Sequence, residues 1–102
     1  MKSRVAVGSL VRDFISSLAP EPRRKLWRSL KELEVGRGDI KQLDDKLYLC
    51  WRLRVNNVRV IFVQNSVRGE RVLFCFFADY RATVYKIVEQ IIADGFIDEL
   101  KN

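Results

Sequence analysis

The chain has 102 residues, of which 48% are hydrophobic and 31% are charged, and its net charge is +6. This composition predicts one globular domain over residues 1–102 and excludes a disordered tail. Histidine is absent and no cysteine cluster occurs, which excludes the usual zinc sites and any histidine-based catalytic triad. No apolar run approaches the roughly 18 residues of a membrane span. We therefore expect a cytoplasmic protein with no membrane segment, no metal, no small-molecule cofactor and reduced, buried cysteines.

The first half of the chain predicts a helical hairpin. Residues 3–7 have the pattern of a short strand, and Ser9 is a candidate cap for a helix that ends near Leu18. A proline-rich break precedes a second helix, which Pro22 is predicted to open. Residues 35–45 have the composition of a loop. The predicted buried stripes are Leu10, Val11, Phe14, Ile15 and Leu18 in the first helix and Leu26, Trp27, Leu30 and Leu33 in the second.

The second half predicts three strands and a last helix. The strands cover about 47–55, 58–65 and 71–78, and the third is apolar on both faces, which favours cover on both sides. The helix starts at Asp79 or nearer Ala82 and ends at Gly95, and residues 96–100 form a short packed segment. The order (β)ααβββα predicts an α+β fold. A helical hairpin packs on a small antiparallel sheet of three to four strands, and a C-terminal helix covers part of the other face.

The first two strands form a hairpin at Asn56–Asn57, because asparagine tolerates the positive φ of a tight turn. One face is then entirely apolar, from Leu49 and Trp51 through to Phe62. The other face carries arginines with no acid predicted nearby. Like charges opposed across a ladder destabilise it, so we interpret this face as a site for an anion. The opposed pairs are Val55 with Val58, Arg54 with Arg59, Leu53 with Val60 and Trp51 with Phe62.

The positive charge is concentrated in residues 46–86, which hold eight basic and two acidic residues and so account for the whole excess. Arg81 and Tyr85 are four residues apart and share a face if the last helix has begun by then. A polyanion-binding surface is one interpretation. The alternative is a solvated strand face with basic residues protecting sheet edges, an ordinary half-buried Tyr85 and an Arg81 that pairs with Asp79.

The spacing LYLCWRLRVNNVRVIF followed by ADYRATVYK resembles the RelE/ParE superfamily of bacterial toxins from type II toxin–antitoxin pairs. The upstream segment FISSLAPEPRRKLWRSLKELEVGRGDIKQLDDKL is similar to the helical hairpin and basic loop of that family. The resemblance covers nearly the whole chain, and we favour the RelE-like branch. It implies a toxin that cuts mRNA on the ribosome without a metal. The implied partners are a cognate antitoxin, which often covers or displaces the last helix, and the ribosome with its mRNA.

The resemblance also implies roles for individual residues. Arg59 matches the strand arginine that holds the scissile phosphate, and Arg81 and Tyr85 match the C-terminal arginine and tyrosine. The implied reaction is attack of the RNA 2′-hydroxyl on the adjacent phosphate. Tyr85 is the expected base or orienter of that hydroxyl, Arg59 the clamp, and Arg81 the charge stabiliser and candidate acid. We predict RNA- and phosphate-binding roles for Lys46, Arg52, Arg54 and Lys86.

Three positions depart from the most active ribonucleases of the family. Tyr80 stands where many relatives carry histidine, and Cys50 and Asp79 stand where some carry basic residues. Two alternatives therefore stay open. One is a ParE-like inhibitor of DNA gyrase, which has the fold without the nuclease residues. The other is a catalytically decayed nucleic-acid-binding protein.

Overall fold

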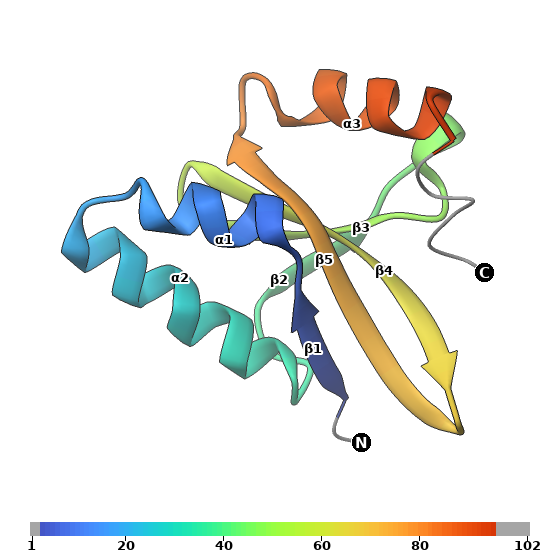
Figure 1. Cartoon of the computed structure of the whole chain (residues 1–102), viewed down its shortest axis with the longest axis horizontal. Helices are drawn as coiled ribbons and strands as arrows, with labels where there is room; N and C mark the ends of the chain where they lie inside the picture. The colour runs from blue at the N-terminus through green and yellow to red at the C-terminus, as the bar shows by residue number, and fades with distance from the viewer. Residues whose placement is uncertain (1–2, 96–102) are drawn as a thin grey trace.

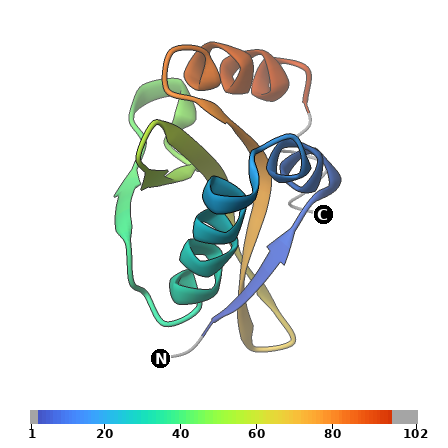
Figure 2. The same cartoon turned by 90° about the vertical axis from the view of Figure 1, so that its left-hand side faces the viewer.

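The computed structural model describes residues 3–95 and has an α+β architecture (Figure 1). A helical hairpin covers one face of a sheet, and a third helix lies on the other side, above the end at which the last strand stops (Figures 1 and 2). The predicted fold class is thus confirmed. The elements are β1 (Arg4–Val7), α1 (Ser9–Ser16), α2 (Pro20–Leu33), β2 (Asp39–Gln42), the 3-10 helix η1 (Asp45–Leu47), β3 (Trp51–Val55), β4 (Val58–Val67), β5 (Glu70–Tyr80) and α3 (Val84–Ala93).

The sheet differs from the prediction in strand number and direction. It has five strands in the order β1-β5-β4-β3-β2, and β1 runs parallel to β5, so the sheet is mixed. The strand β2 lies in the segment that composition predicted as a loop. Its four residues include a single apolar one, Ile40, which pairs with Leu53. An edge strand of four residues is too short to show an alternating apolar pattern of its own. Its strand conformation depends on the pairing with β3.

Two apolar cores form, one on each face of the sheet. The apolar side of the β3–β4 hairpin packs against α1 and α2 together with residues of β5. The second core lies between the opposite face, η1 and α3. The inner strand β5, between β1 and β4, contributes Cys75 to the first core and Phe76 to the second, which confirms that it is covered on both sides. No helix within residues 3–95 has the length and hydropathy needed to cross a bilayer.

Several predicted details of the helices are wrong. The N-cap of α1 is Gly8 rather than Ser9, and α2 begins at Pro20, two residues before the predicted Pro22. Leu10 and Trp27 are 48% and 38% exposed, although both were predicted to be buried. They lie at the margins of their apolar stripes, where helical spacing alone does not decide between core and solvent.

The strand predicted over 47–55 is also shorter than expected. Its first part is η1, and β3 begins only at Trp51. As a result Leu49 packs in the second core, on the side opposite Trp51, although alternation placed both on one face. A change from helical turn to strand breaks the two-residue period on which that prediction depended.

The start of α3 is later than predicted. Because Tyr80 still pairs with Val58 in the sheet, the helix begins at Val84 instead of Asp79 or Ala82. Arg81 therefore lies before the helix and does not share a helical face with Tyr85. The predicted C-terminal limit is confirmed, since the last helical residue is Ala93 and Gly95 has a φ of +84°. The segment predicted to pack over 96–100 lies outside the described residues.

Candidate functional site

The β3–β4 hairpin positions the predicted arginines, and its register is as predicted. Arg54 pairs with Arg59 and Trp51 pairs with Phe62 across the ladder. Asn56 has a φ of 54°, the left-handed conformation that asparagine tolerates and that the predicted tight turn requires. The hairpin thus places its arginines on the face opposite the helical hairpin, as the sequence predicted.

Arg59 is the least exposed of these arginines, with only 6% of its surface accessible. Its Nη1 donates to the main-chain oxygens of Asn56, at 2.8 Å, and Val58, at 3.1 Å. Asp79 is its neighbour in register on β5, but no ion pair joins the two within residues 3–95, and Asp79 Oδ1 accepts a hydrogen bond from the Tyr80 main chain. The guanidinium is folded against its own turn and held by carbonyl dipoles.

Arg81 reaches the same turn from β5. Its main-chain N–H donates to the Asn57 oxygen at 2.9 Å, and its side chain is exposed. The first turn of α3 follows at once and carries Tyr85, which is half-buried and packs against the second core. Arg59 through its side chain and Arg81 through its main chain thus both bond to the β3–β4 turn, and Tyr85 follows on the first turn of α3. We call these three residues the turn cluster. Figure 1 shows α3 above the end of the sheet at which β5 stops.

Arg52 and Arg54 form a different arrangement. The Arg52 Nη1 atom donates to the main-chain oxygen of Asp39 at 3.0 Å and to its Oδ1 at 3.1 Å. Arg54 Nη1 lies 3.9 Å from the other carboxylate oxygen. We call these three residues the Asp39 cluster. The prediction that no acid lies near the arginines is wrong, because β2 was not predicted and its first residue pairs with Arg54 in the sheet.

The two predicted lysines lie near α3. Lys46 is exposed on η1, which packs against α3, and Lys86 is exposed on α3 itself. Both add exposed positive charge to the two elements that cover this side of the sheet.

Cys50 and Cys75 are free and fully buried, which confirms the prediction of buried reduced thiols. Burial raises the pKa of Cys50 to about 11 and that of Cys75 to about 12. At neutral pH both remain protonated and are therefore poor nucleophiles. Cys50 belongs to the second core. The presence of cysteine where some relatives carry a basic residue therefore changes the interior of the protein and not its charged surface.

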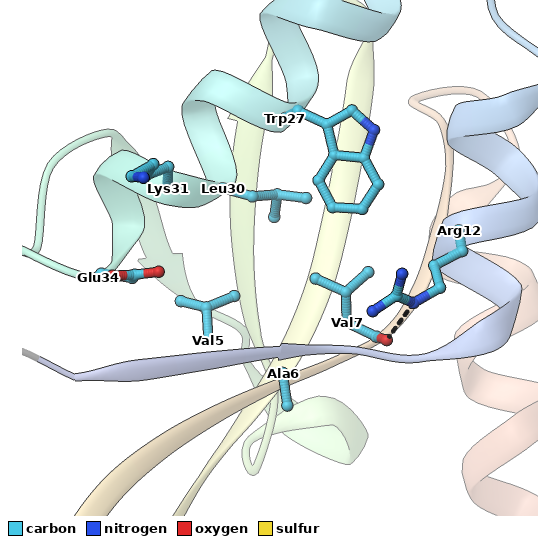
Figure 3. A pocket seen from close by; sticks show the side chains of 8 residues that line it. All are labelled: Val5, Ala6, Val7, Arg12, Trp27, Leu30, Lys31 and Glu34. Atoms are coloured by element: carbon cyan, nitrogen blue, oxygen red, sulfur yellow. Dashed lines mark hydrogen bonds between the residues drawn. The ribbon is translucent and has the colours of Figure 1, made fainter.

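A groove of about 550 Å³ lies between β1 and α2, on the side of the sheet that the helical hairpin covers (Figure 3). Val5 and Val7 point from β1 toward Leu30 and the ring of Trp27 (Figure 3). Arg12 closes one end, where its Nε donates to the Val7 oxygen at 3.2 Å. Sequence reasoning missed this groove because it predicted Trp27 to be buried.

The fold is that of the RelE toxins, as comparison with solved structures shows. A chain of the toxin–antitoxin complex RelBE2 from Mycobacterium tuberculosis matches with a TM-score of 0.65 and 15% identity, over 79% of this chain and 100% of the other. The archaeal RelE–RelB complex from Pyrococcus horikoshii OT3 gives 0.61 and 24%, over 79% and 97%. The RelB–RelE antitoxin–toxin complex from Methanococcus jannaschii gives 0.58 and 14%, over 80% and 96%. No protein-family model and no curated protein matches the chain.

Proposed function

We propose that this protein is the toxin of a toxin–antitoxin pair, and that it acts in the cytoplasm by cutting mRNA on the ribosome. The observation that carries the proposal is that the Arg59 side chain and the Arg81 main chain both bond to the Asn56–Asn57 turn, with Tyr85 on the helix that follows. RelE toxins provide the structural precedent for the fold. The net charge of +6, all of it in residues 46–86, fits a polyanionic substrate.

The proposed reaction needs three functions from the protein. The 2′-oxygen attacks phosphorus, so its proton must be removed or the hydroxyl aligned, and Tyr85 supplies the only phenol in the turn cluster. The phosphorane that forms carries two negative charges, which Arg81 stabilises with its exposed guanidinium. The bond between phosphorus and the 5′-oxygen then breaks. The leaving oxygen takes a proton from Arg81, the candidate acid, which regains one from solvent, and the products are a 2′,3′-cyclic phosphate and a 5′-hydroxyl.

Arg59 acts in this scheme through a fixed positive charge. Two carbonyl oxygens hold its Nη1, which leaves the N–H groups of Nε and Nη2 as further donors of the same rigid fork. The guanidinium is thereby oriented before substrate arrives. Such preorganised charge lowers the barrier without the cost of ordering a flexible side chain.

The test combines growth and RNA chemistry. Induced expression in a bacterium should stop protein synthesis, and primer extension on mRNA bound to purified ribosomes should show new 5′ ends only when the protein is added. The upstream fragments should end in a 2′,3′-cyclic phosphate. Cleavage that yields 3′-hydroxyl ends would contradict attack by the 2′-oxygen.

A second candidate function is ParE-like inhibition of DNA gyrase without catalysis. It is favoured by two features of the arginines: Arg59 is only 6% exposed, and Asp39 binds Arg52 and lies near Arg54. The number of freely available cations is therefore small for a nuclease. Loss of DNA supercoiling before any loss of protein synthesis would select this alternative.

We further propose that the cognate antitoxin docks in the groove beside β1. The edge strand β1 pairs only with β5 within residues 3–95, so its outer edge is open to another strand. The half-exposed Trp27 offers apolar area, and the two basic residues of the lining, Arg12 and Lys31, outnumber its one acidic residue, Glu34, which favours an acidic partner. Co-purification with the product of the adjacent gene should be lost in Trp27→Glu and kept in Tyr48→Glu, which alters an exposed aromatic residue elsewhere.

A further inference from the structure

A second hollow lies at the same end of the molecule as the turn cluster, but on the face that the helical hairpin covers. Its volume is about 350 Å³, which falls within the range of roughly 300–1,000 Å³ for small-ligand pockets. The floor is apolar and comes from both layers of the fold. It is formed by Leu18, Leu26, Val55 and Val58.

One wall of the hollow is an ordered aromatic ring. Tyr80 is 45% exposed, and its ring contacts Phe14 edge-to-face at a centroid distance of 5.3 Å and an angle of 67°. This contact fixes the ring beside the apolar floor without burying it. An accessible aromatic ring over an apolar floor suits a flat heterocycle, since every nucleobase has a π face that can stack.

The rim is polar. Asn56, Asn57 and Lys25 line it, and all three side chains are exposed. Carboxamides offer both a donor and an acceptor, which is the combination that pairs with the edge of a base. The ammonium of Lys25 adds a positive charge for a phosphate that follows or precedes that base.

The hollow and the turn cluster share one structural segment. The Asn56 oxygen accepts from Arg59, and the Asn57 oxygen accepts from the Arg81 main chain, while both asparagines line the hollow. The two sites are therefore the two sides of a single turn. A nucleotide laid across this turn has its phosphate on the arginine side and its base on the Tyr80 side.

We propose that this hollow, the base pocket, binds one nucleobase of the RNA strand whose phosphate lies at Arg59 and Arg81. The inference deepens the proposed function and rests on it, because it assumes an RNA substrate. Tyr80 is then a residue that determines specificity. The larger stacking surface of a purine favours purines over pyrimidines in a pocket whose floor is apolar.

The experiment measures nucleotide binding by amide chemical shifts of the full chain, without ribosomes or cleavage. Adenosine 5′-monophosphate should shift the signals of Asn57, Tyr80 and Lys25, whereas ribose 5-phosphate, which lacks the base, should not. Uridine 5′-monophosphate should bind more weakly. Tyr80→Leu should weaken adenosine 5′-monophosphate binding by roughly 10-fold or more, as expected when one stacking partner is lost.

The matched control is Tyr48→Leu, the same change at a tyrosine that is 59% exposed on another part of the surface, and it should leave binding unchanged. Shifts confined to Arg59, Arg81 and their neighbours would mean a phosphate site alone and would overturn the base pocket. Absence of any nucleotide-dependent shift would overturn it as well. In both cases the proposed nuclease remains open to its own test by primer extension on ribosomes.

Discussion

The arginine-bearing face of the sheet holds its cations in two ways. In the turn cluster, carbonyl oxygens bind Arg59 and orient its side chain, and no ion pair within residues 3–95 offsets its charge. In the Asp39 cluster, a carboxylate binds Arg52 and lies near Arg54, which orients the first and offsets the charge of both. Neighbouring arginines on one face of a sheet therefore differ in the charge that they offer to a ligand. Only cations held by dipoles keep their full attraction for a phosphate.

The largest expected effect concerns Tyr85. Tyr85→Phe keeps the ring that packs in the second core and removes the hydroxyl. We expect ribosome-dependent cleavage to slow by about 100- to 10,000-fold, the range of a lost general acid–base group. Ribosome binding should stay intact, as measured by co-sedimentation. Cleavage at the wild-type rate would remove Tyr85 from the mechanism, and Tyr48→Phe serves as the control for loss of an exposed phenol.

Arg81 and Arg54 test the comparison directly, because both are exposed and each belongs to a different cluster. Arg81→Ala should reduce the cleavage rate by about 100-fold or more, as loss of a transition-state donor does. Arg54→Ala should reduce it only a few-fold, since Asp39 already offsets that charge. Single-turnover rates on saturating ribosome–mRNA complexes provide the measurement. Equal losses for the two variants would mean that the clusters act as one surface.

Arg71→Ala is the charge-matched control for both substitutions. Arg71 is exposed and lies at the start of β5, beside the β4–β5 turn, and it donates to Gln64 at 2.6 Å. Figure 1 shows this turn at the end of the sheet away from α3. Arg71→Ala removes the same single positive charge as the other two substitutions, but at a place away from the Asn56–Asn57 turn. We expect the cleavage rate of this variant to match that of the wild type.

Arg59 should matter for stability as well as for activity. In Arg59→Ala, the Asn56 and Val58 oxygens lose their side-chain donor, and we expect the free energy of unfolding to fall by about 1–3 kcal/mol. Exposed Arg54→Ala should change it by about 0.5 kcal/mol or less. Urea unfolding followed by tryptophan fluorescence measures both. Arg59→Lys restores the charge but not the planar fork, so recovered stability without recovered cleavage would isolate the role of the guanidinium geometry.

The smallest expected effect comes from Asp39→Asn. Removing this carboxylate leaves the charges of Arg52 and Arg54 without their counter-ion. Affinity for a short single-stranded RNA should rise by up to about 5-fold at low salt, the equivalent of one exposed ion pair. Fluorescence anisotropy measures the change, and Asp13→Asn on α1 is the control with equal charge. A fall in affinity would show that Asp39 is needed to orient Arg52 and does not compete with the RNA.

The local features of this protein follow from sequence alone. The alternation of apolar residues and arginines around Asn56–Asn57 predicted the hairpin register, because a two-residue turn and a two-residue period leave one solution. The apolar run of β5 likewise predicted a strand covered on both sides. Both signals lie within a few adjacent residues. The general α+β order was predicted for the same reason.

The site itself depends on contacts between segments far apart in the chain. Asp39 meets Arg52 only because β2 pairs with β3, and Arg81 stays outside α3 only because β5 continues to pair with β4. The burial of Arg59 and the exposure of Trp27 were likewise decided by packing. The sequence around a residue does not show which distant residues it will contact. The sequence therefore identified the arginines, and the tertiary structure decided which of them a carboxylate offsets.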